Sequence, residues 1–247
     1  MSPTIALIVC FALPHAALAA DTLADLLEGV QEAERTTAPL RADATAEIEG
    51  IKGVVQDRLV IVERAAADGK IGKQVSVQLE KAKLRLLALG PADLHLAVDG
   101  KAKKAAPDSQ VAETSWTVED FLPFSRSRCA AVRIADISDA QATVVCEPER
   151  KVSQYALMVY KFDREKFVTQ QVLLYKDTMT NLVKMLRKDD YEQVGSKWRP
   201  KRIVMQDFKL RTKDTFALEW QPSPGAPAEL FDAKTFATAP PLFAAPK

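Results

Sequence analysis

The sequence predicts a mainly β fold, a strongly curved antiparallel sheet or barrel of about ten or eleven strands with an N-terminal helix and a short helical lid. Apolar and polar residues alternate over most of residues 41–98 and 154–220, which is the period of a strand with one buried face. Gly and Asp residues recur between these runs and indicate turns. Hydrophobic residues make up 47% of the 247 residues, enough for one core.

A helix is predicted at residues 21–37, because apolar residues recur there at helical spacing and Pro39 follows. The alternation then begins at residue 41. It is clearest in residues 73–80 and 83–98, which carry leucine and valine at every second position. We therefore expect one continuous β region, divided only by an insertion in the middle of the chain.

This insertion, residues 101–128, is polar at first and then rich in aromatic side chains. Thr117 is a suitable cap for a short helix, because Asp120 follows at the position of a capping-box acid. The apolar residues around this helix are interpreted either as a lid over the mouth of the sheet or as contacts that attach the helix to the sheet. The lid candidates are Trp116, Phe121, Leu122 and Phe124.

The first 19 residues have the features of a cleaved signal peptide. An apolar run leads to Ala17-Leu18-Ala19, the small-x-small pattern that signal peptidases recognise. A buried N-terminal strand or an anchor helix is the alternative. We expect export to the periplasm, a single domain over residues 20–236, and a disordered Pro/Ala-rich tail over residues 237–247.

Two cysteines, Cys129 and Cys146, remain after the predicted cleavage. Between them lie two β-prone runs and a polar turn near Ile137 and Ser138. A hairpin turning there places the two cysteines opposite each other, within reach of a disulfide. An oxidising compartment favours that bond, and two buried free thiols are the alternative.

The sequence contains no recognisable catalytic motif. The 34 basic and 33 acidic residues nearly cancel, so we expect no nucleic-acid partner. His95 is the one histidine after the predicted cleavage, and alternation points it away from Leu94 and Leu96, toward solvent. Asp189-Asp190 is interpreted as a solvated turn. We expect neither an enzyme nor a bound metal or cofactor.

The C-terminal third carries the most specific pattern. A Tyr-x-Asp after one strand and a Leu-x-Lys strand are followed by Trp198-x-Pro200-x-x-Ile203-x-Met205-x-Asp207 and a Thr215-x-x-Leu218 strand. In this order the stretch resembles the outer-membrane lipoprotein-sorting protein family, the LolA/LolB-like periplasmic carriers. Residues 116–120 and 229–236 also look like that family. The resemblance covers residues 21–236.

The resemblance implies an unclosed β-barrel, capped by helices, whose interior shelters the acyl chains of a lipid or lipoprotein. It further implies membrane-associated donor and acceptor proteins, no cofactor and no chemistry; we expect a monomer. The chain departs from the family at residues 94–100, where an aromatic strand and a basic patch are expected. Only Lys101, Lys103 and Lys104 follow there, which leaves the cargo open.

A soluble carrier needs a continuous apolar concavity, because each exposed CH₂ of an acyl chain costs about 0.8 kcal/mol in water. A packed core produces the same alternation, so both interpretations stay open. The cavity candidates are Val75, Val77, Leu84, Leu86, Leu94, Leu96, Leu157, Val172, Leu174, Ile203, Met205, Phe216 and Leu218.

Two other functions remain open from the sequence. A non-catalytic module of the same fold would sense lipid or lipoprotein and regulate or assist a membrane partner. A hydrolase would use His95, although the sequence offers no obvious partner for that histidine.

Overall fold

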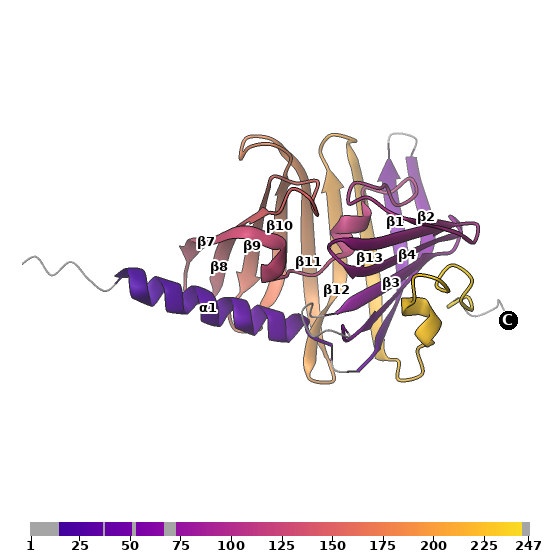
Figure 1. Ribbon diagram of the computed structural model, residues 1–247, viewed down its shortest axis with the longest axis horizontal. Coiled ribbons are helices and arrows are strands. Elements are labelled where there is room, and N and C mark those ends of the chain that lie inside the picture. Colours follow the sequence, from indigo (N-terminus) through magenta and orange to yellow (C-terminus); the bar gives the residue numbers. More distant parts are fainter. Residues whose placement is uncertain (1–14, 37, 51–52, 67–72, 244–247) are drawn as a thin grey trace, which may run out of the picture.

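Thirteen antiparallel strands form one curved sheet that does not close into a barrel (Figure 1). The computed structural model describes residues 15–36, 38–50, 53–66 and 73–243. The strands lie in the order β6-β5-β4-β3-β2-β1-β13-β12-β11-β10-β9-β8-β7, so β6 and β7 are the two edges. The predicted fold class is confirmed, and the number of strands is higher than the expected ten or eleven.

The elements follow one another mostly as hairpins. They are α1 (His15–Glu34), β1 (Leu40–Gly50), β2 (Gly53–Arg64), β3 (Gln74–Leu79), β4 (Leu84–Gly90), β5 (Asp93–Val98), β6 (Lys101–Lys104), the 3-10 helices η1 (Val118–Phe121) and η2 (Arg126–Arg128), β7 (Cys129–Ile137), β8 (Gln141–Pro148), β9 (Leu157–Asp163), β10 (Val168–Tyr175), β11 (Leu182–Val194), β12 (Lys197–Asp207), β13 (Thr212–Pro222) and η3 (Ala228–Phe231).

Hydrophobic periodicity did not predict two of the strand segments. Strand β6 is exposed at all four positions, so it has no buried face and no alternation to detect. Strand β11 continues through Asp189 and Asp190 to Val194, where we expected a turn. Asp190 accommodates this with a positive φ of 54°, which aspartate tolerates better than most residues.

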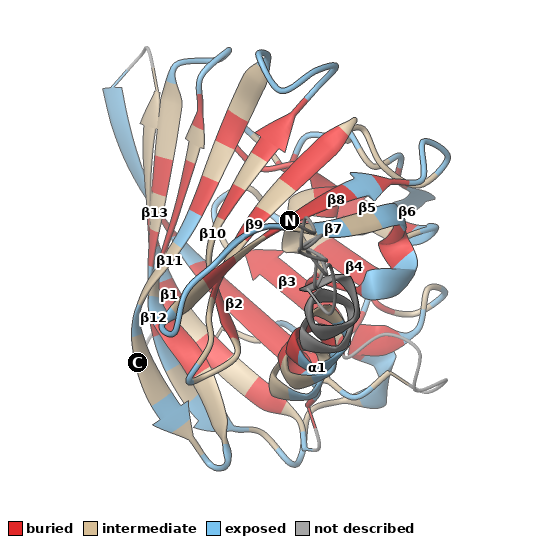
Figure 2. Ribbon diagram, turned by 90° about the vertical axis from the view of Figure 1, so that its left-hand side faces the viewer, coloured by how far each residue is buried: buried red, intermediate tan, exposed pale blue. Residues whose placement is uncertain are grey.

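The main core lies on the concave side of the sheet. It combines alternate residues of most strands with α1 and the segment between β6 and β7. A second cluster joins the convex side of β2 and β4 to the C-terminal segment, and a third lies on the convex side of β8, β9 and β10. The curled sheet therefore buries apolar residues on both faces. Figure 2 marks the buried residues along the strands.

Helix α1 lies along the open side of the curled sheet (Figure 2) and contacts β7, β10 and β12. Leu26, Leu27 and Val30 are its buried face, as the sequence indicated. The ring of Phe167 packs so close to Gly29 that a Cβ there would lie 2.4 Å from it. The predicted signal peptide lies mostly outside the described residues; its last residues, 15–19, begin this helix.

We expected residues 237–247 to be disordered, but residues 237–243 pack on the convex side of the sheet. Arg85 Nη1 donates to the carbonyl oxygen of Phe236 at 2.8 Å, and Arg41 Nη2 donates to that of Leu242 at 2.9 Å. Phe236, directly before this segment, meets His95 edge-on with ring centroids 6.0 Å apart, and the His95 side chain is 14% exposed rather than open to solvent. Residues 244–247 lie outside the described residues.

Candidate functional site

Residues 105–128, between β6 and β7, fill the concave side of the sheet, and we call them the plug segment. Trp116 stacks on Phe216 of β13, with ring centroids 5.0 Å apart. Phe124 meets Tyr160 of β9 edge-on, with centroids 4.9 Å apart. Such aromatic pairs add to the free energy of apolar burial. The plug segment is thus a separate apolar layer between the sheet and solvent.

Buried polar contacts hold the plug segment in place. The carboxylate of Asp120 accepts hydrogen bonds from Lys184 Nζ at 2.8 Å and from the Tyr155 hydroxyl at 2.7 Å. Five residues before Asp120, the backbone N–H of Ser115 donates to Asp214 Oδ2 of β13 at 2.5 Å. These contacts reach β11 and β13 from one short segment, so release of the segment requires several of them to break together.

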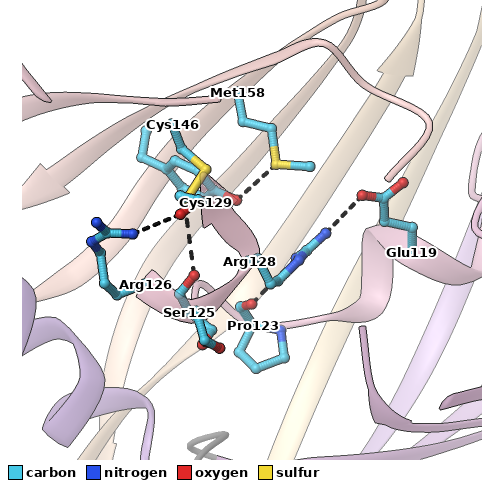
Figure 3. The surroundings of a disulfide bond; sticks show 10 residues. Glu119, Pro123, Ser125, Arg126, Arg128, Cys129, Cys146 and Met158 are labelled. Atoms are coloured by element: carbon cyan, nitrogen blue, oxygen red, sulfur yellow. Dashed lines mark hydrogen bonds and ion pairs between the residues drawn. A yellow bond between two sulfur atoms is a disulfide. The ribbon is translucent and has the colours of Figure 1, made fainter. Parts of the chain in front are cut away.

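A disulfide joins β7 to β8 at the point where the plug segment ends and β7 starts (Figure 3). The predicted bond between Cys129 and Cys146 is confirmed, with Cα atoms 5.4 Å apart. The predicted register was wrong, because a bulge after Cys129 makes the ladder pair it with Pro148, while Cys146 pairs with Val132. The bond therefore fixes one end of the plug segment, where β7 starts.

The same end of the plug segment contains a buried ion pair. Arg128 Nη2 lies 2.8 Å from Glu119 Oε1 (Figure 3), and both side chains are at most 5% exposed. Burial raises the pKa of Glu119, and the charge of Arg128 opposes that rise. Glu119 also accepts from the backbone N–H of Gln154 at 2.9 Å. The pair therefore stiffens the plug segment against the β8–β9 connection.

A second buried ionic network joins α1 to the sheet. Lys73 Nζ lies 2.8 Å from Glu34 of the helix and 2.7 Å from Glu63 of β2. Arg199 Nε of β12 lies 3.2 Å from Glu63, and Lys188 Nζ lies 4.0 Å from Glu34. Burial alone raises the pKa of Glu34, but the surrounding cations outweigh it and lower the pKa. The network carries three cations and two carboxylates.

Two small hollows remain between the plug segment and the sheet. The larger measures about 70 Å³ and has aromatic walls, with the ionic network at its border; the smaller measures about 30 Å³. Pockets for small organic ligands commonly measure about 300–1,000 Å³. An acyl chain therefore enters this interior only if the plug segment or α1 moves.

The structure brings twelve of the thirteen cavity candidates into the concave cluster. Leu157 is the exception, because it packs on the convex side with Val145 and Tyr175. The candidates that line the larger hollow are Val75, Ile203 and Phe216, and those that line the smaller are Val172, Leu174 and Met205. The candidates that fill the concave core without lining a hollow are Val77, Leu84, Leu86, Leu94, Leu96 and Leu218. The lid candidates that border one or both hollows are Trp116, Phe121, Leu122 and Phe124.

Several residues of this interior were missed by the sequence argument. Leu186 borders both hollows, and Ile61 and Phe167 border the larger one. Alternation along β2 and β11 was a usable signal for Ile61 and Leu186. The charged residues of the ionic network gave no such signal, because a charged residue usually lies at the surface.

Solved structures share this architecture. A DUF1329 family protein from Desulfovibrio piger superposes with a TM-score of 0.72 at 10% identity, over 87% of this chain and 97% of the other. A Vibrio parahaemolyticus structure described as an outer membrane lipoprotein-sorting protein domain gives 0.72 at 14% identity, over 85% and 97%. A LolA superfamily protein from Nitrosomonas europaea gives 0.64 at 13% identity, over 85% and 96%. The chain has a LolA-like fold.

At these identities the likeness concerns the fold alone. No family model matches the sequence, and no curated protein matches it. The LolA-like fold was nevertheless anticipated by the motifs of the C-terminal third, which form β11, β12 and β13. Within the described part of the chain, no helix combines the length and apolar character needed to cross a membrane. No group of three or more side chains suited to metal binding occurs among the same residues.

Asp214, which holds the plug segment through Ser115, makes the stability of this LolA-like fold depend on pH. Burial raises the pKa of Asp214 from 3.8 to about 6. Between these values the folded state binds a proton that the unfolded state has lost, so stability falls as pH rises. We expect Asp214→Asn to gain about 3 kcal/mol relative to the unmodified protein between pH 4 and pH 7.

Urea unfolding of both proteins across that pH range measures the difference. Asp139→Asn, which alters an exposed carboxylate in the β7–β8 turn, serves as the matched control and should follow the unmodified protein. A constant difference between Asp214→Asn and the unmodified protein would show that Asp214 does not titrate in this range.

Proposed function

We propose that the protein is an exported periplasmic carrier that shelters the acyl chains of a lipid or lipoprotein on the concave side of its sheet. The observation that carries the proposal is the construction of the interior. Its apolar wall is covered by the plug segment, whose aromatic side chains Trp116 and Phe124 pack on that wall. The resemblance of the sequence and the LolA-like fold support the same function.

In the proposed cycle, an acyl chain replaces the plug segment as the apolar group that covers the concave side of the sheet. Movement of the plug segment exposes residues such as Ile203 and Phe216, and an incoming acyl chain covers them again. Burial of each CH₂ contributes about 0.8 kcal/mol, which offsets the lost contacts of the plug segment. No covalent step takes part, and His95 has no role in the cycle.

Uptake of a fluorescent fatty-acyl probe tests this proposal. We expect saturable binding by the unmodified protein and at least tenfold weaker binding by Leu186→Trp, because Leu186 borders both hollows and a larger ring there occupies the space of the ligand. Leu173→Trp is the matched control, since Leu173 packs with the convex cluster on neighbouring β10. Binding is measured by fluorescence titration after circular dichroism confirms that each variant is folded.

Absence of saturable uptake by the unmodified protein, or equal uptake by both tryptophan variants, would contradict the carrier. A stable membrane protein partner recovered without extractable lipid would then support the non-catalytic interaction module.

A further inference from the structure

Large exposed apolar side chains gather at one end of the sheet. Among the described residues seven such side chains occur, and five lie at the end where β1 runs into β2. We call these five the apolar rim: Val54, Val55, Met179, Phe208 and Leu210. Their exposures range from 40% to 61%. Val98 of β5 is level with Leu59, further along β2. The seventh, Ile137, lies in the β7–β8 hairpin at the opposite end.

The strand register places the apolar rim on three neighbouring hairpins. Glu49 at the end of β1 pairs with Lys213 at the start of β13, so the β1–β2 and β12–β13 hairpins turn at the same end. Lys184 near the start of β11 pairs with Asp207 at the end of β12, so the β10–β11 hairpin turns there as well. The ends of the strands that carry these hairpins lie along the upper edge of the sheet in Figure 1.

Basic side chains accompany these apolar ones. The β12–β13 hairpin has the sequence Phe208-Lys209-Leu210-Arg211, in which cations alternate with apolar residues, and all four residues are exposed. Lys176 precedes Met179 in the β10–β11 hairpin. Isolated exposed apolar residues are ordinary, but a shared edge of apolar residues with interspersed cations is typical of a surface that meets anionic lipid headgroups.

We propose that the apolar rim docks the protein on the surface of an anionic phospholipid bilayer, with the rim side chains entering the headgroup region. Strands β10, β11, β12, β13, β1 and β2 are consecutive neighbours in the sheet. At about 4.8 Å between strands, they span an edge roughly 24 Å wide, enough to fix the orientation of the protein. The inference is independent of the proposed carriage of lipid, because docking does not require an occupied interior.

The β12–β13 hairpin, which carries Phe208 and Leu210 of the apolar rim, also contacts the plug segment. Thr212 directly follows Arg211, and its hydroxyl lies 2.7 Å from the hydroxyl of Ser115. The next contact, from Ser115 to Asp214, lies two residues further along β13. A membrane at the apolar rim would therefore touch the hairpin whose base holds the plug segment.

Co-sedimentation of the full chain with vesicles tests the docking. We expect binding to vesicles of phosphatidylglycerol and phosphatidylcholine, and at least tenfold weaker binding to phosphatidylcholine alone. Phe208→Ser with Leu210→Ser should reduce partition to the anionic vesicles at least tenfold. Ile137→Ser, the same change at the opposite end, should leave it unchanged, and any contribution of the N-terminal segment is common to all variants.

Equal unfolding midpoints in urea show that the variants are folded, which is expected because the substituted side chains are exposed. The proposal is overturned if the unmodified protein does not bind anionic vesicles. It is also overturned if Ile137→Ser loses as much binding as the double variant Phe208→Ser with Leu210→Ser. Loss of vesicle binding with normal uptake of the acyl probe would separate the two proposals, since the probe reports on the interior alone.

Discussion

Replacing Lys73 with methionine is expected to lower the free energy of unfolding by about 3–5 kcal/mol. Lys73 pairs with Glu34 and Glu63, and its side chain is 8% exposed. Methionine keeps most of the side-chain volume but removes the charge, so two buried carboxylates lose their closest cation. Arg199 and Lys188 remain, but they are farther from these carboxylates or already bonded.

Equilibrium unfolding in urea measures this loss. Lys213→Met is the matched control, because the Lys213–Glu49 pair has a similar distance of 3.2 Å but both side chains are about 40% exposed. An exposed pair of this kind contributes at most about 1 kcal/mol. If the two variants lose the same small amount, the network around Lys73 does not hold α1 to the sheet.

A disulfide between the plug segment and β13 is expected to abolish uptake of the acyl probe. In the double variant Ser115→Cys with Thr212→Cys, the two sulfur atoms replace hydroxyl oxygens that lie 2.7 Å apart, so a bond needs only a small adjustment. The middle of the plug segment is then also covalently bound to the sheet. We expect binding at least a hundredfold weaker than in the unmodified protein, because the remaining hollows are far smaller than an acyl chain.

Mild reduction should restore uptake in this variant. The unmodified protein treated with the same reductant controls for the native disulfide, and Ser115→Cys alone controls for loss of the hydroxyl. If the oxidised double variant takes up the probe normally, the plug segment does not need to move, and lipid either enters by movement of α1 or binds elsewhere.

The two cysteines illustrate what local sequence can and cannot establish. The paired β-prone runs between them correctly predicted a hairpin with a disulfide. The register depended on where extra residues enter the ladder, and the bulges after Cys129 and Ile134 shift it. A bulge changes the pairing without changing the hydrophobic pattern very much, so the sequence alone did not reveal it.

Alternation identified the concave face well because most strands are apolar on one side only. Strand β9 is different, since Leu157 and Met158 are both buried but on opposite faces. When both faces of a strand are covered, periodicity no longer distinguishes inside from outside. For this reason Leu157 was predicted to lie with the cavity candidates, although it lies on the opposite, convex face of the sheet.

The ionic network could not be predicted from the sequence. Glu63 and Arg199 are 136 positions apart, and each resembles an ordinary surface charge when considered alone. Only the antiparallel order of the strands and the position of α1 bring them together. Their burial follows from the completed fold, so no local pattern announces it.

An incompletely closed barrel has two edge strands, each with unpaired backbone N–H and C=O groups along one side. A strand of another molecule can form hydrogen bonds with these groups. In the edge strand β6, three of the four positions are lysines, Lys101, Lys103 and Lys104, and all of them are exposed. A second chain that paired with β6 would bring these like charges together and strip their hydration, which disfavours the association. The lysines thus allow the sheet to stay open without making the protein prone to aggregate.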